Sequence, residues 1–277
     1  IKRWDGRDPI THDLVVMTEQ GIGDILHFLR FLPLLRSYID QKQPDIKIWV
    51  QTRHSLYQLL KHNHLFEGFN FFVADTEKSP KEFLPKSASH FIPLLSLPLL
   101  LRQNKQFPAD PYFKFKSDHG AKWRRQYKKM QPDKAVGLAW FGRTENSRIP
   151  VSCLEALNRL KNVWWISLQK KMEDDFLYPK IKKMIIHRYG FDHFFQTAAM
   201  MQGLDCVVCN DSAVAHLAGA MGVECHVILP FVYDWRWEPL NGKNQWYPNT
   251  FCYYSPALED WKSPIEQLIK RLEKKFK

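Results

Sequence analysis

Short runs of β-branched and aromatic residues alternate along this chain with longer stretches whose apolar residues recur at helical spacing. Such alternation is typical of parallel sheets covered by helices, because parallel strands need a long crossover connection, which is usually a helix. We therefore expect an α/β fold. The expected strands are residues 14–17, 46–50, 71–73, 135–140, 163–166, 184–186, 206–209 and 225–229, and the clearest expected helices are residues 25–38, 151–160, 212–221 and 264–276.

The chain has 277 residues, which at roughly 150 residues per domain predicts two domains. A proline-containing segment at 108–111 and a basic, helix-like segment at 122–129 separate the two sets of expected strands. We place the boundary near residue 130, which gives an N-terminal domain of residues 1–130 and a C-terminal domain of residues 131–277. The last expected helix has one apolar stripe on an otherwise charged surface, so it requires a partner surface.

Basic residues outnumber acidic ones. The 40 Lys and Arg against 29 Asp and Glu give a formal net charge of +11, which favours an anionic partner such as phosphate, nucleic acid or an acidic membrane surface. A nucleic-acid binder is one interpretation of the basic segment 122–129. Interleaved aromatic residues are sparse there, however, so a solvated helix face is favoured and no nucleic-acid partner is expected.

The cysteine content and the apolar stretches bear on the compartment. Five cysteines are too few for a disulfide scaffold and cannot all pair within one chain, which favours a reducing compartment. The most apolar stretch, residues 92–101, contains two prolines and is shorter than the roughly 20 residues that cross a bilayer. We expect a soluble, cytoplasmic protein. Its start at Ile1 rather than a methionine leaves open whether residues precede it in the natural protein.

The first candidate site is the segment 19–24, Glu-Gln-Gly-Ile-Gly-Asp, between an expected strand and an expected helix. Gly21 and Gly23 would let a ligand approach the backbone, and the helix N-terminus favours negative charge. Asp24 would lie at the carboxyl edge of the sheet, where it could act as a base. The alternative, which spacing alone favours, is that Asp24 only caps the helix. The dinucleotide-binding motif G-x-G-x-x-G is not matched, because its third glycine is missing.

The second candidate site is the segment 205–222, in which a buried strand turns directly into a helix of small residues. Asp211, Ser212 and Ala213 form the turn. The free N–H groups of the first helical turn, the serine hydroxyl and the His216 imidazole four residues later would lie on one face and bind a diphosphate. The alternative is that Asp211 and Ser212 cap the helix and His216 is a core histidine. The segment by itself supports both interpretations equally.

These two segments resemble the heptosyltransferase-like, family 9-like glycosyltransferases, which have two Rossmann-like domains facing a cleft, an architecture called GT-B. The resemblance is closest to the glycosyltransferase module that follows tetratricopeptide repeats in many bacterial proteins. The matching motifs run in order along nearly the whole chain, at residues 4–6, 19–27, 95–98, 136–140, 147–150, 167–169, 211–220, 234–237 and 246–248.

The resemblance implies a role for each matching residue. Asp24 matches the aspartate proposed as catalytic base. The loop that holds the donor's diphosphate and the neighbouring sugar is matched by Asp211, Ser212, Ala213 and His216. Arg148 matches a basic residue that contacts donor phosphate, and Gln169 lies where family members meet the nucleoside.

The resemblance also implies an inverting reaction without a metal or cofactor, and a C-terminal helix that crosses back onto the N-terminal domain. The loop 143–147 looks shortened relative to the family, which bears on the donor contacts.

Other motifs support less specific interpretations. Cys206 and Cys209 have C-x-x-C spacing, but that spacing on a strand places the thiols on opposite faces, which favours buried structural cysteines. His62 and His64 lie in a polar stretch and are expected at the surface. The segment 234–237, Asp-Trp-Arg-Trp, could stack a sugar or position an acceptor through Trp235 and Arg236, or could anchor a buried loop.

The sequence thus predicts a glycosyltransferase with a nucleoside-diphosphate-sugar donor bound by the C-terminal domain and a glycan, lipid or protein acceptor held by the N-terminal domain. The alternative is a noncatalytic nucleotide-sugar or glycan binding module. An upstream repeat domain as partner and peripheral contact with a membrane are left open.

Overall fold

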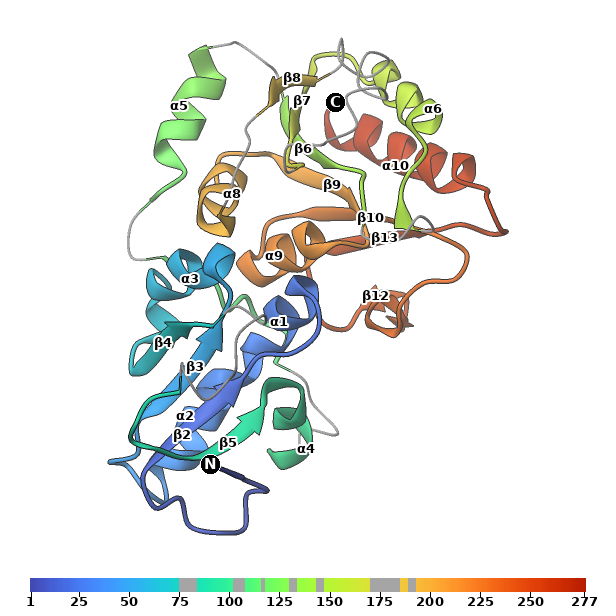
Figure 1. Ribbon diagram of the computed structural model, residues 1–277. Coiled ribbons are helices and arrows are strands. Elements are labelled where there is room, and N and C mark those ends of the chain that lie inside the picture. The colour runs from blue at the N-terminus through green and yellow to red at the C-terminus, as the bar shows by residue number, and fades with distance from the viewer. Residues whose placement is uncertain are drawn as a thin grey trace. The chain divides into compact units, whose positions relative to one another are not determined.

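The computed structural model describes residues 1–74, 84–101, 108–115, 118–129, 134–142, 147–169, 185–188 and 193–277 (Figure 1). The chain divides into two compact units. The first consists of Ile1–Pro108, Tyr112–Lys116 and His193–Phe195, and the second of Ala109–Pro111, Ser117–Asp192 and Gln196–Lys277. Each unit is built on a parallel sheet, which confirms the predicted α/β class.

The first unit contains a five-stranded sheet in the order β1-β5-β2-β3-β4, with every neighbouring pair parallel. Its centre is buried, because β2 carries a run of fully buried aliphatic residues, as expected of a parallel strand covered on both faces. Two of its strands, β1 and β5, were not predicted. The strands are β1 (Lys2–Arg3), β2 (Asp13–Met17), β3 (Ile48–Thr52), β4 (Phe69–Val73) and β5 (Ala88–Pro93).

The helix expected at 25–38 is three consecutive elements, α1 (Ile22–Phe28), η1 (Leu29–Phe31) and α2 (Leu32–Asp40). Pro33 lies in the first turn of α2 and has no amide N–H to donate to the preceding turn, which explains the interruption. The other helical segments of this unit are α3 (His54–Lys61), η2 (His64–Phe66), η4 (Leu94–Ser96) and α4 (Leu97–Leu100).

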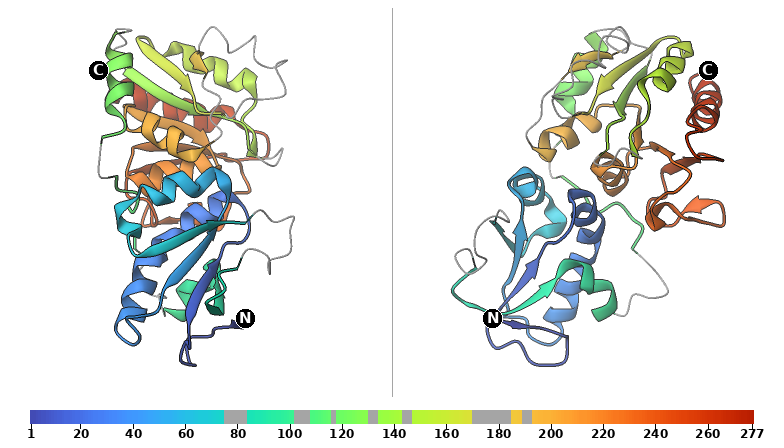
Figure 2. Two further views of the ribbon diagram at one scale, coloured as in Figure 1. Left: turned by 60° about the vertical axis from the view of Figure 1, so that its left-hand side comes forward. Right: turned by 45° about the vertical axis from the view of Figure 1, so that its right-hand side comes forward.

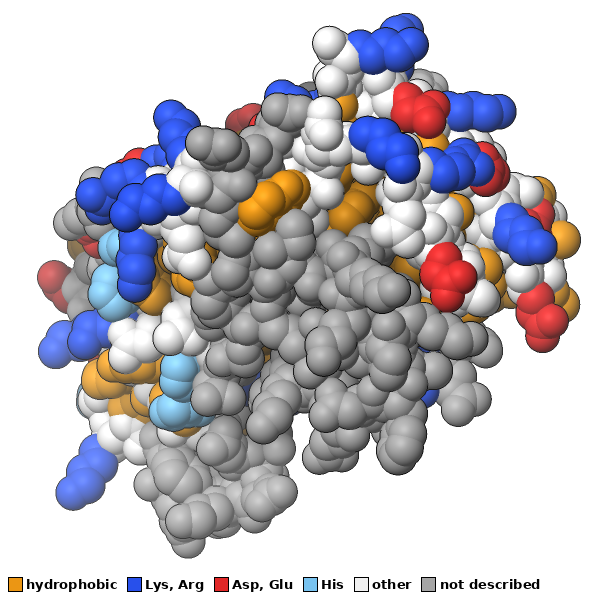
Figure 3. Space-filling view, turned by 90° about the horizontal axis from the view of Figure 1, so that it is seen from above, with side chains coloured by type: hydrophobic (Ala, Val, Ile, Leu, Met, Phe, Trp, Pro, Cys, Tyr) orange, Lys and Arg blue, Asp and Glu red, His pale blue; other side chains and the backbone are white. Residues whose placement is uncertain are grey.

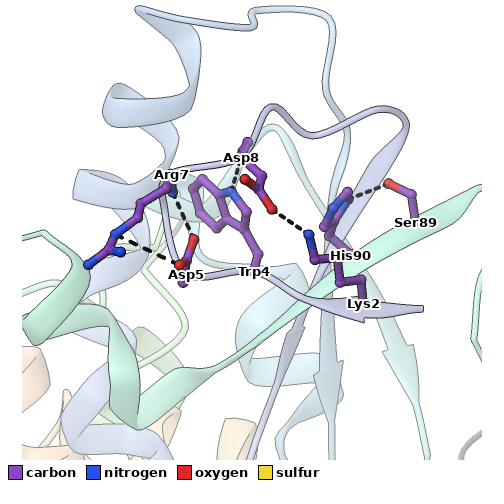
Figure 4. Close-up of polar contacts among 7 residues, drawn as sticks. All are labelled: Lys2, Trp4, Asp5, Arg7, Asp8, Ser89 and His90. Carbon is purple, nitrogen blue, oxygen red and sulfur yellow. Dashed lines mark hydrogen bonds and ion pairs between the residues drawn. The ribbon is translucent and has the colours of Figure 1, made fainter.

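The Trp-Asp-Gly motif at the start of the chain folds into a tight loop beside the first sheet (Figure 4). The Trp4 ring is buried, and its Nε1 donates to the backbone oxygen of Asp8 at 2.9 Å. Lys2 forms an ion pair with the Asp8 carboxylate. Gly6 has a φ of 87°, and a Cβ there would lie 2.9 Å from a methyl carbon of Leu100. This loop therefore fixes the edge strand β1 to the unit.

The second unit contains a six-stranded parallel sheet in the order β13-β10-β9-β6-β7-β8. Strand β13 was not predicted. The strands are β6 (Lys134–Ala139), β7 (Val163–Ser167), β8 (Ile185–Arg188), β9 (Cys206–Asn210), β10 (Cys225–Leu229) and β13 (Thr250–Tyr254). A separate hairpin is formed by β11 (Pro239–Leu240) and β12 (Lys243–Asn244). The helical segments of this half of the chain are α5 (Ala121–Lys129), α6 (Val151–Leu154), η6 (Glu155–Arg159), α8 (Phe194–Met201), α9 (Ala213–Met221), η8 (Trp235–Trp237) and α10 (Lys262–Lys275).

The terminal helix α10 packs on the sheet of the second unit (Figure 2). Its apolar stripe, Ile265, Leu268, Ile269 and Leu272, is buried in one core with α6 and with strands β6, β9 and β10. The expectation that this helix crosses back onto the N-terminal domain is therefore wrong. The stripe finds its partner surface in the sheet of its own unit, where burial of these side chains offsets the cost of ordering the helix.

The division between the units lies earlier in the chain than the predicted boundary near residue 130, because the basic helix α5 belongs to the second unit. Trp123 and Tyr127 pack against Gly203, where an added Cβ would lie 3.0 Å from the Trp123 Cβ. Arg124 donates to the backbone oxygen of Gln202 at 2.7 Å. These contacts attach α5 to the turn that follows α8.

Candidate functional site

The strand order of the second sheet reverses between β6 and β9. The next strands in sequence after β6 lie on one side of it, whereas β9, β10 and β13 lie on the other. Ligands of open α/β sheets bind at such a reversal, beyond the carboxyl ends of the two strands. Ala139 at the end of β6 pairs with Cys209 of β9, so residues 140–142 and 210–212 leave the sheet side by side.

Asn210 links the two chain segments at this edge. Its side chain is fully buried, and its Nδ2 donates to the backbone oxygen of Ser147 at 2.7 Å. Its Oδ1 is buried and has no hydrogen-bond partner among the described residues. Gly142 is required by close packing, because an added Cβ would overlap the Ser147 hydroxyl. Sequence reasoning did not single out Asn210, although it directly precedes the predicted Asp211 turn.

Arg148 is held at the same edge. Its Nε donates to the backbone oxygen of Gly142 at 3.3 Å, and its guanidinium carbon lies 4.0 Å from the centroid of the Phe141 ring. A cation stacked on an aromatic ring in this way has a restricted position. Residues 143–146 of the loop that looked shortened lie outside the described residues.

The predicted nucleoside residue, Gln169, has a backbone partner. Its Oε1 accepts hydrogen bonds from the amides of both Trp140 and Phe141 at 2.7 Å. These bonds satisfy the two N–H groups at which the chain leaves β6. The side-chain carbonyl is therefore engaged by the protein itself, and a nucleoside contact of Gln169 stays a prediction.

Helix α9 begins at this edge. Ser212 is its N-cap residue, with φ −158° and ψ 170°, but no side-chain cap bond forms; the hydroxyl instead donates to the backbone oxygen of Asn210 at 3.3 Å. Ser212 therefore occupies the N-cap position, as the capping interpretation predicts, but its side chain does not form the capping hydrogen bond. Asp211 and Ala213 flank Ser212 and are half-buried. Gly222, with a φ of 72°, ends the helix as predicted.

His216 lies one turn into α9, and its side chain is 5% exposed. Its Nδ1 is 2.9 Å from the Tyr247 hydroxyl, and its ring stacks on Trp237 with centroids 5.0 Å apart. This environment fits the core-histidine alternative. Contact of His216 with a ligand stays a prediction.

The loop after β10 combines an anchor with an exposed ring. Trp237 is fully buried, whereas Trp235 is 51% exposed. Arg236 pairs with the Asp234 carboxylate at 2.8 Å, and its guanidinium lies 4.8 Å from the Trp235 centroid. Trp235 also meets Trp246 edge-on at 5.6 Å. The buried Trp237 fits the loop-anchor interpretation, and contact of Trp235 or Arg236 with a sugar or an acceptor stays a prediction.

In the first sheet, the order reverses between β2 and β5. The segment after β2 carries the Glu-Gln-Gly-Ile-Gly-Asp motif, so Gly21, Gly23 and Asp24 lie at the corresponding edge of this unit. Asp24 is the third residue of α1, and its Oδ2 accepts the amide hydrogen of Gly21 at 2.9 Å. This is the predicted helix-capping interaction. The role of Asp24 as a base stays a prediction.

The backbone around this motif is constrained. Gln20 has a φ of 65°, in the left-handed region, and its carbonyl oxygen accepts from Arg53 at 2.7 Å. Glu19, which sequence reasoning did not single out, has a buried Oε2 without a hydrogen-bond partner among the described residues. A second carboxylate therefore belongs to the same turn as Asp24.

The remaining cysteine and histidine motifs show no sign of a catalytic or metal site among the described residues. Cys206 and Cys209 are buried free thiols, as predicted, and burial raises the pKa of Cys206 well above its ordinary value, which disfavours thiolate chemistry. His62 is exposed, as predicted, and His64 is half-buried. Within the described part of the chain, no group of three or more His, Cys, Asp or Glu could hold a metal ion. In that part, too, every helix is too short or too polar to span a membrane.

Comparison with known proteins supports the fold. No family model matches the sequence. Protein FlbA of Caulobacter vibrioides is 23% identical over 296 residues, which cover 98% of this chain and 48% of FlbA, so the chain spans about half the length of this curated relative.

Three solved structures cover nearly all of the chain. A family 9 glycosyl transferase from Veillonella parvula superposes with a TM-score of 0.67 at 14% identity and covers 97% of this chain and 98% of its own. The ADP-heptose lipopolysaccharide heptosyltransferase II of E. coli superposes with a TM-score of 0.63 at 12% identity, and the match covers 95% of this chain and 98% of that one. The E. coli heptosyltransferase WaaC with ADP superposes with a TM-score of 0.59 at 12% identity, and the match covers 96% of this chain and 100% of that one. The chain therefore has the GT-B fold of these glycosyltransferases.

Proposed function

We propose that this protein is a glycosyltransferase that transfers a sugar from a nucleoside diphosphate sugar to a glycan, lipid or protein acceptor. The donor's diphosphate binds at the β6/β9 edge of the second unit, and the acceptor is activated at the β2/β5 edge of the first. The fold supports this proposal, as does the heptosyltransferase that was solved with ADP.

One observation carries the donor assignment. Helix α9, whose N-cap side chain does not cap it, begins at the strand-order reversal, and Arg148 is bonded to Gly142 in the segment that leaves the neighbouring strand β6. A helix N-terminus offers free amide hydrogens and a partial positive charge, and an arginine adds a full one. Together they suit the negative charge that grows on the departing diphosphate as the bond to the sugar breaks, and no metal is required for that stabilisation.

The acceptor step needs a base. In an inverting transfer, the acceptor oxygen attacks the anomeric carbon of the sugar while its proton passes to a carboxylate, for which we propose Asp24. The bond between that carbon and the diphosphate oxygen breaks, and the nucleoside diphosphate leaves. General-base catalysis of this kind typically contributes about 10²- to 10⁴-fold to the rate.

The donor is identified by a thermal-shift screen against ADP, GDP, UDP and their sugars, because a ligand that binds only the folded state raises the unfolding temperature by mass action. Ser212→Trp should abolish the shift by filling the space in front of α9. Ser212→Ala should preserve it and leave stability nearly unchanged, because the hydroxyl does not cap the helix. Equal shifts in the wild type and Ser212→Trp would place the donor elsewhere.

The base is tested with Asp24→Asn. The amide oxygen can still accept the Gly21 hydrogen, so the fold and nucleotide binding should persist while transfer falls by at least about a hundredfold. Glu19→Gln, in the same turn, is the matched control. Comparison of the two variants shows which of the two carboxylates acts as the base. Turnover at the wild-type rate in Asp24→Asn rejects this choice of base.

A noncatalytic nucleotide-sugar or glycan binding module is the second candidate. The observation that favours it is the hydrogen bond from the Gly21 amide to the Asp24 carboxylate, which gives that side chain a structural role at the start of α1. The two candidates separate in an assay for release of nucleoside diphosphate from the donor that the thermal shift identifies. A binding module would show saturable binding of that donor and no release with any acceptor.

A further inference from the structure

Helix α5 carries an unusual density of positive charge. Four of its side chains, Lys122, Arg125, Lys128 and Lys129, are exposed. None of the four forms a hydrogen bond or ion pair with a described residue. The fifth basic residue, Arg124, differs because it pairs with Asp118. No acidic residue lies within the helix.

The four cations share one face. At about 100° per residue, they fall within roughly a third of the helix circumference, and the aromatic residues Trp123 and Tyr127 fall on the other side. Tyr127 is buried and Trp123 is half-buried against Gly203. Figure 3 shows Lys and Arg side chains gathered where α5 lies, at the left of that view. The basic face is therefore held outward by the packing of the opposite one.

We propose that this basic face of α5, comprising Lys122, Arg125, Lys128 and Lys129, docks the protein onto an anionic phospholipid surface. Clusters of four to eight basic residues on an amphipathic helix are the pattern that binds acidic lipid headgroups, through attraction that falls off within a Debye length. This inference goes beyond the proposed function and does not depend on it.

The composition of the face favours lipid over the other anionic partners. Single-stranded nucleic acid is held by aromatic side chains on which bases stack, and the two aromatic residues of α5 face the protein. The apolar residues of the helix are likewise occupied by packing, so the contact is electrostatic and without insertion. Attachment should therefore be reversible and weakened by salt.

Vesicle co-sedimentation of the full chain tests this proposal. The probes are phosphatidylcholine vesicles with and without phosphatidylglycerol, at low and high salt. Lys122, Arg125, Lys128 and Lys129 are changed together to Gln, a good helix former. The matched control changes Lys262, Lys270, Lys274 and Lys277 of the same unit to Gln, which removes the same charge from other exposed positions. The thermal midpoint verifies that both variants are folded.

We expect the wild type and the control variant to sediment with the vesicles that contain phosphatidylglycerol and not with those of phosphatidylcholine alone. The α5 variant should bind the anionic vesicles at least tenfold more weakly. Equal losses in both variants would show that net charge is responsible and would overturn the assignment to α5. Wild-type protein that does not bind anionic vesicles would also overturn it. A single-stranded oligonucleotide that binds the α5 face more tightly than the vesicles do would replace lipid by nucleic acid.

Discussion

The Nδ1 atom of His216 lies 2.9 Å from the hydroxyl oxygen of Tyr247. This contact joins the first half of α9 to the loop that follows the β11–β12 hairpin, and both side chains are buried. Asn244 supports the loop by accepting from the amides of Trp246 and Tyr247 at 2.9 Å. The helix proposed to bind diphosphate is therefore positioned by a network outside the sheet.

Tyr247→Phe removes the hydroxyl from this contact and keeps the ring. We expect a loss of about 1 kcal/mol in the free energy of unfolding, because a buried imidazole nitrogen loses its partner. Urea denaturation measures it. Tyr57→Phe is the control, since no hydrogen bond is described for that hydroxyl, and an equal loss there would contradict the assigned role of Tyr247.

Gly219→Ala should destabilise the protein, although alanine is the better helix former. An added Cβ would overlap the Tyr247 ring, which the bond to His216 holds in place. Overpacking of this kind typically costs about 1–3 kcal/mol. The same change in a Tyr247→Ala background should cost less or even stabilise, which a double-mutant cycle measures. An unchanged cost in both backgrounds would mean that Tyr247 is not the obstacle.

Two substitutions of Gln169 distinguish its structural role from a role in nucleotide binding. Gln169→Ala leaves the Trp140 and Phe141 amides without their acceptor, so we expect about 1–3 kcal/mol of destabilisation. Gln169→Glu keeps a carbonyl-type acceptor for both amides and should unfold close to the wild type. Because it places a negative charge near the proposed diphosphate, it should weaken nucleotide binding instead. Isothermal titration and urea denaturation of both variants distinguish the two effects.

Stability should fall in acid because of a cluster formed by the buried His226 and the half-buried Glu224. Glu224 lies 3.0 Å from His226 and 2.5 Å from Lys275. The hydrogen bond from His226, followed by the Lys275 interactions, lowers the pKa of Glu224 to about 2. Burial lowers the pKa of His226, although the Glu224 carboxylate acts in the opposite direction. Tyr253 contacts the other imidazole nitrogen at 2.8 Å, and Arg271 adds a positive charge nearby.

The lowered pKa values of Glu224 and His226 both make the folded protein less stable as the pH falls. The unfolded chain protonates Glu224 near pH 4.5 and His226 near pH 6.5, whereas the folded chain protonates each at lower pH. Stability is therefore full above pH 6.5, declines below it as unfolded His226 binds a proton, and declines further from pH 4.5 towards 2. Urea midpoints across this range should decline less steeply below pH 4.5 for Glu224→Gln. Glu155→Gln, at an exposed position without a hydrogen bond or ion pair to a described residue, should leave the slope nearly unchanged, and identical slopes for all three proteins would refute this assignment.

Local patterns were sufficient for most of the framework. The strand β2 and the helix α9 with its terminal Gly222 were predicted because apolar runs, helical spacing and a left-handed glycine are local signals. Strand β13 was missed because a hairpin, rather than a helix, precedes it, so the alternation rule did not apply. Strand β5 ends at Pro93, and its last two residues were assigned to the apolar stretch 92–101, which continues beyond it.

The sequence by itself determined the α/β class, most of the strands and the turns at which a ligand site could form, because each appears as a pattern of residues close together in the chain. Tertiary structure alone decided which side chains are already engaged by the protein. Gln169 bonds a backbone amide 29 residues away, and His216 a hydroxyl 31 residues away. The stripe of α10 likewise packs on strands of its own unit. Such partners are brought together by the folding of distant segments onto one sheet, and no local spacing encodes them.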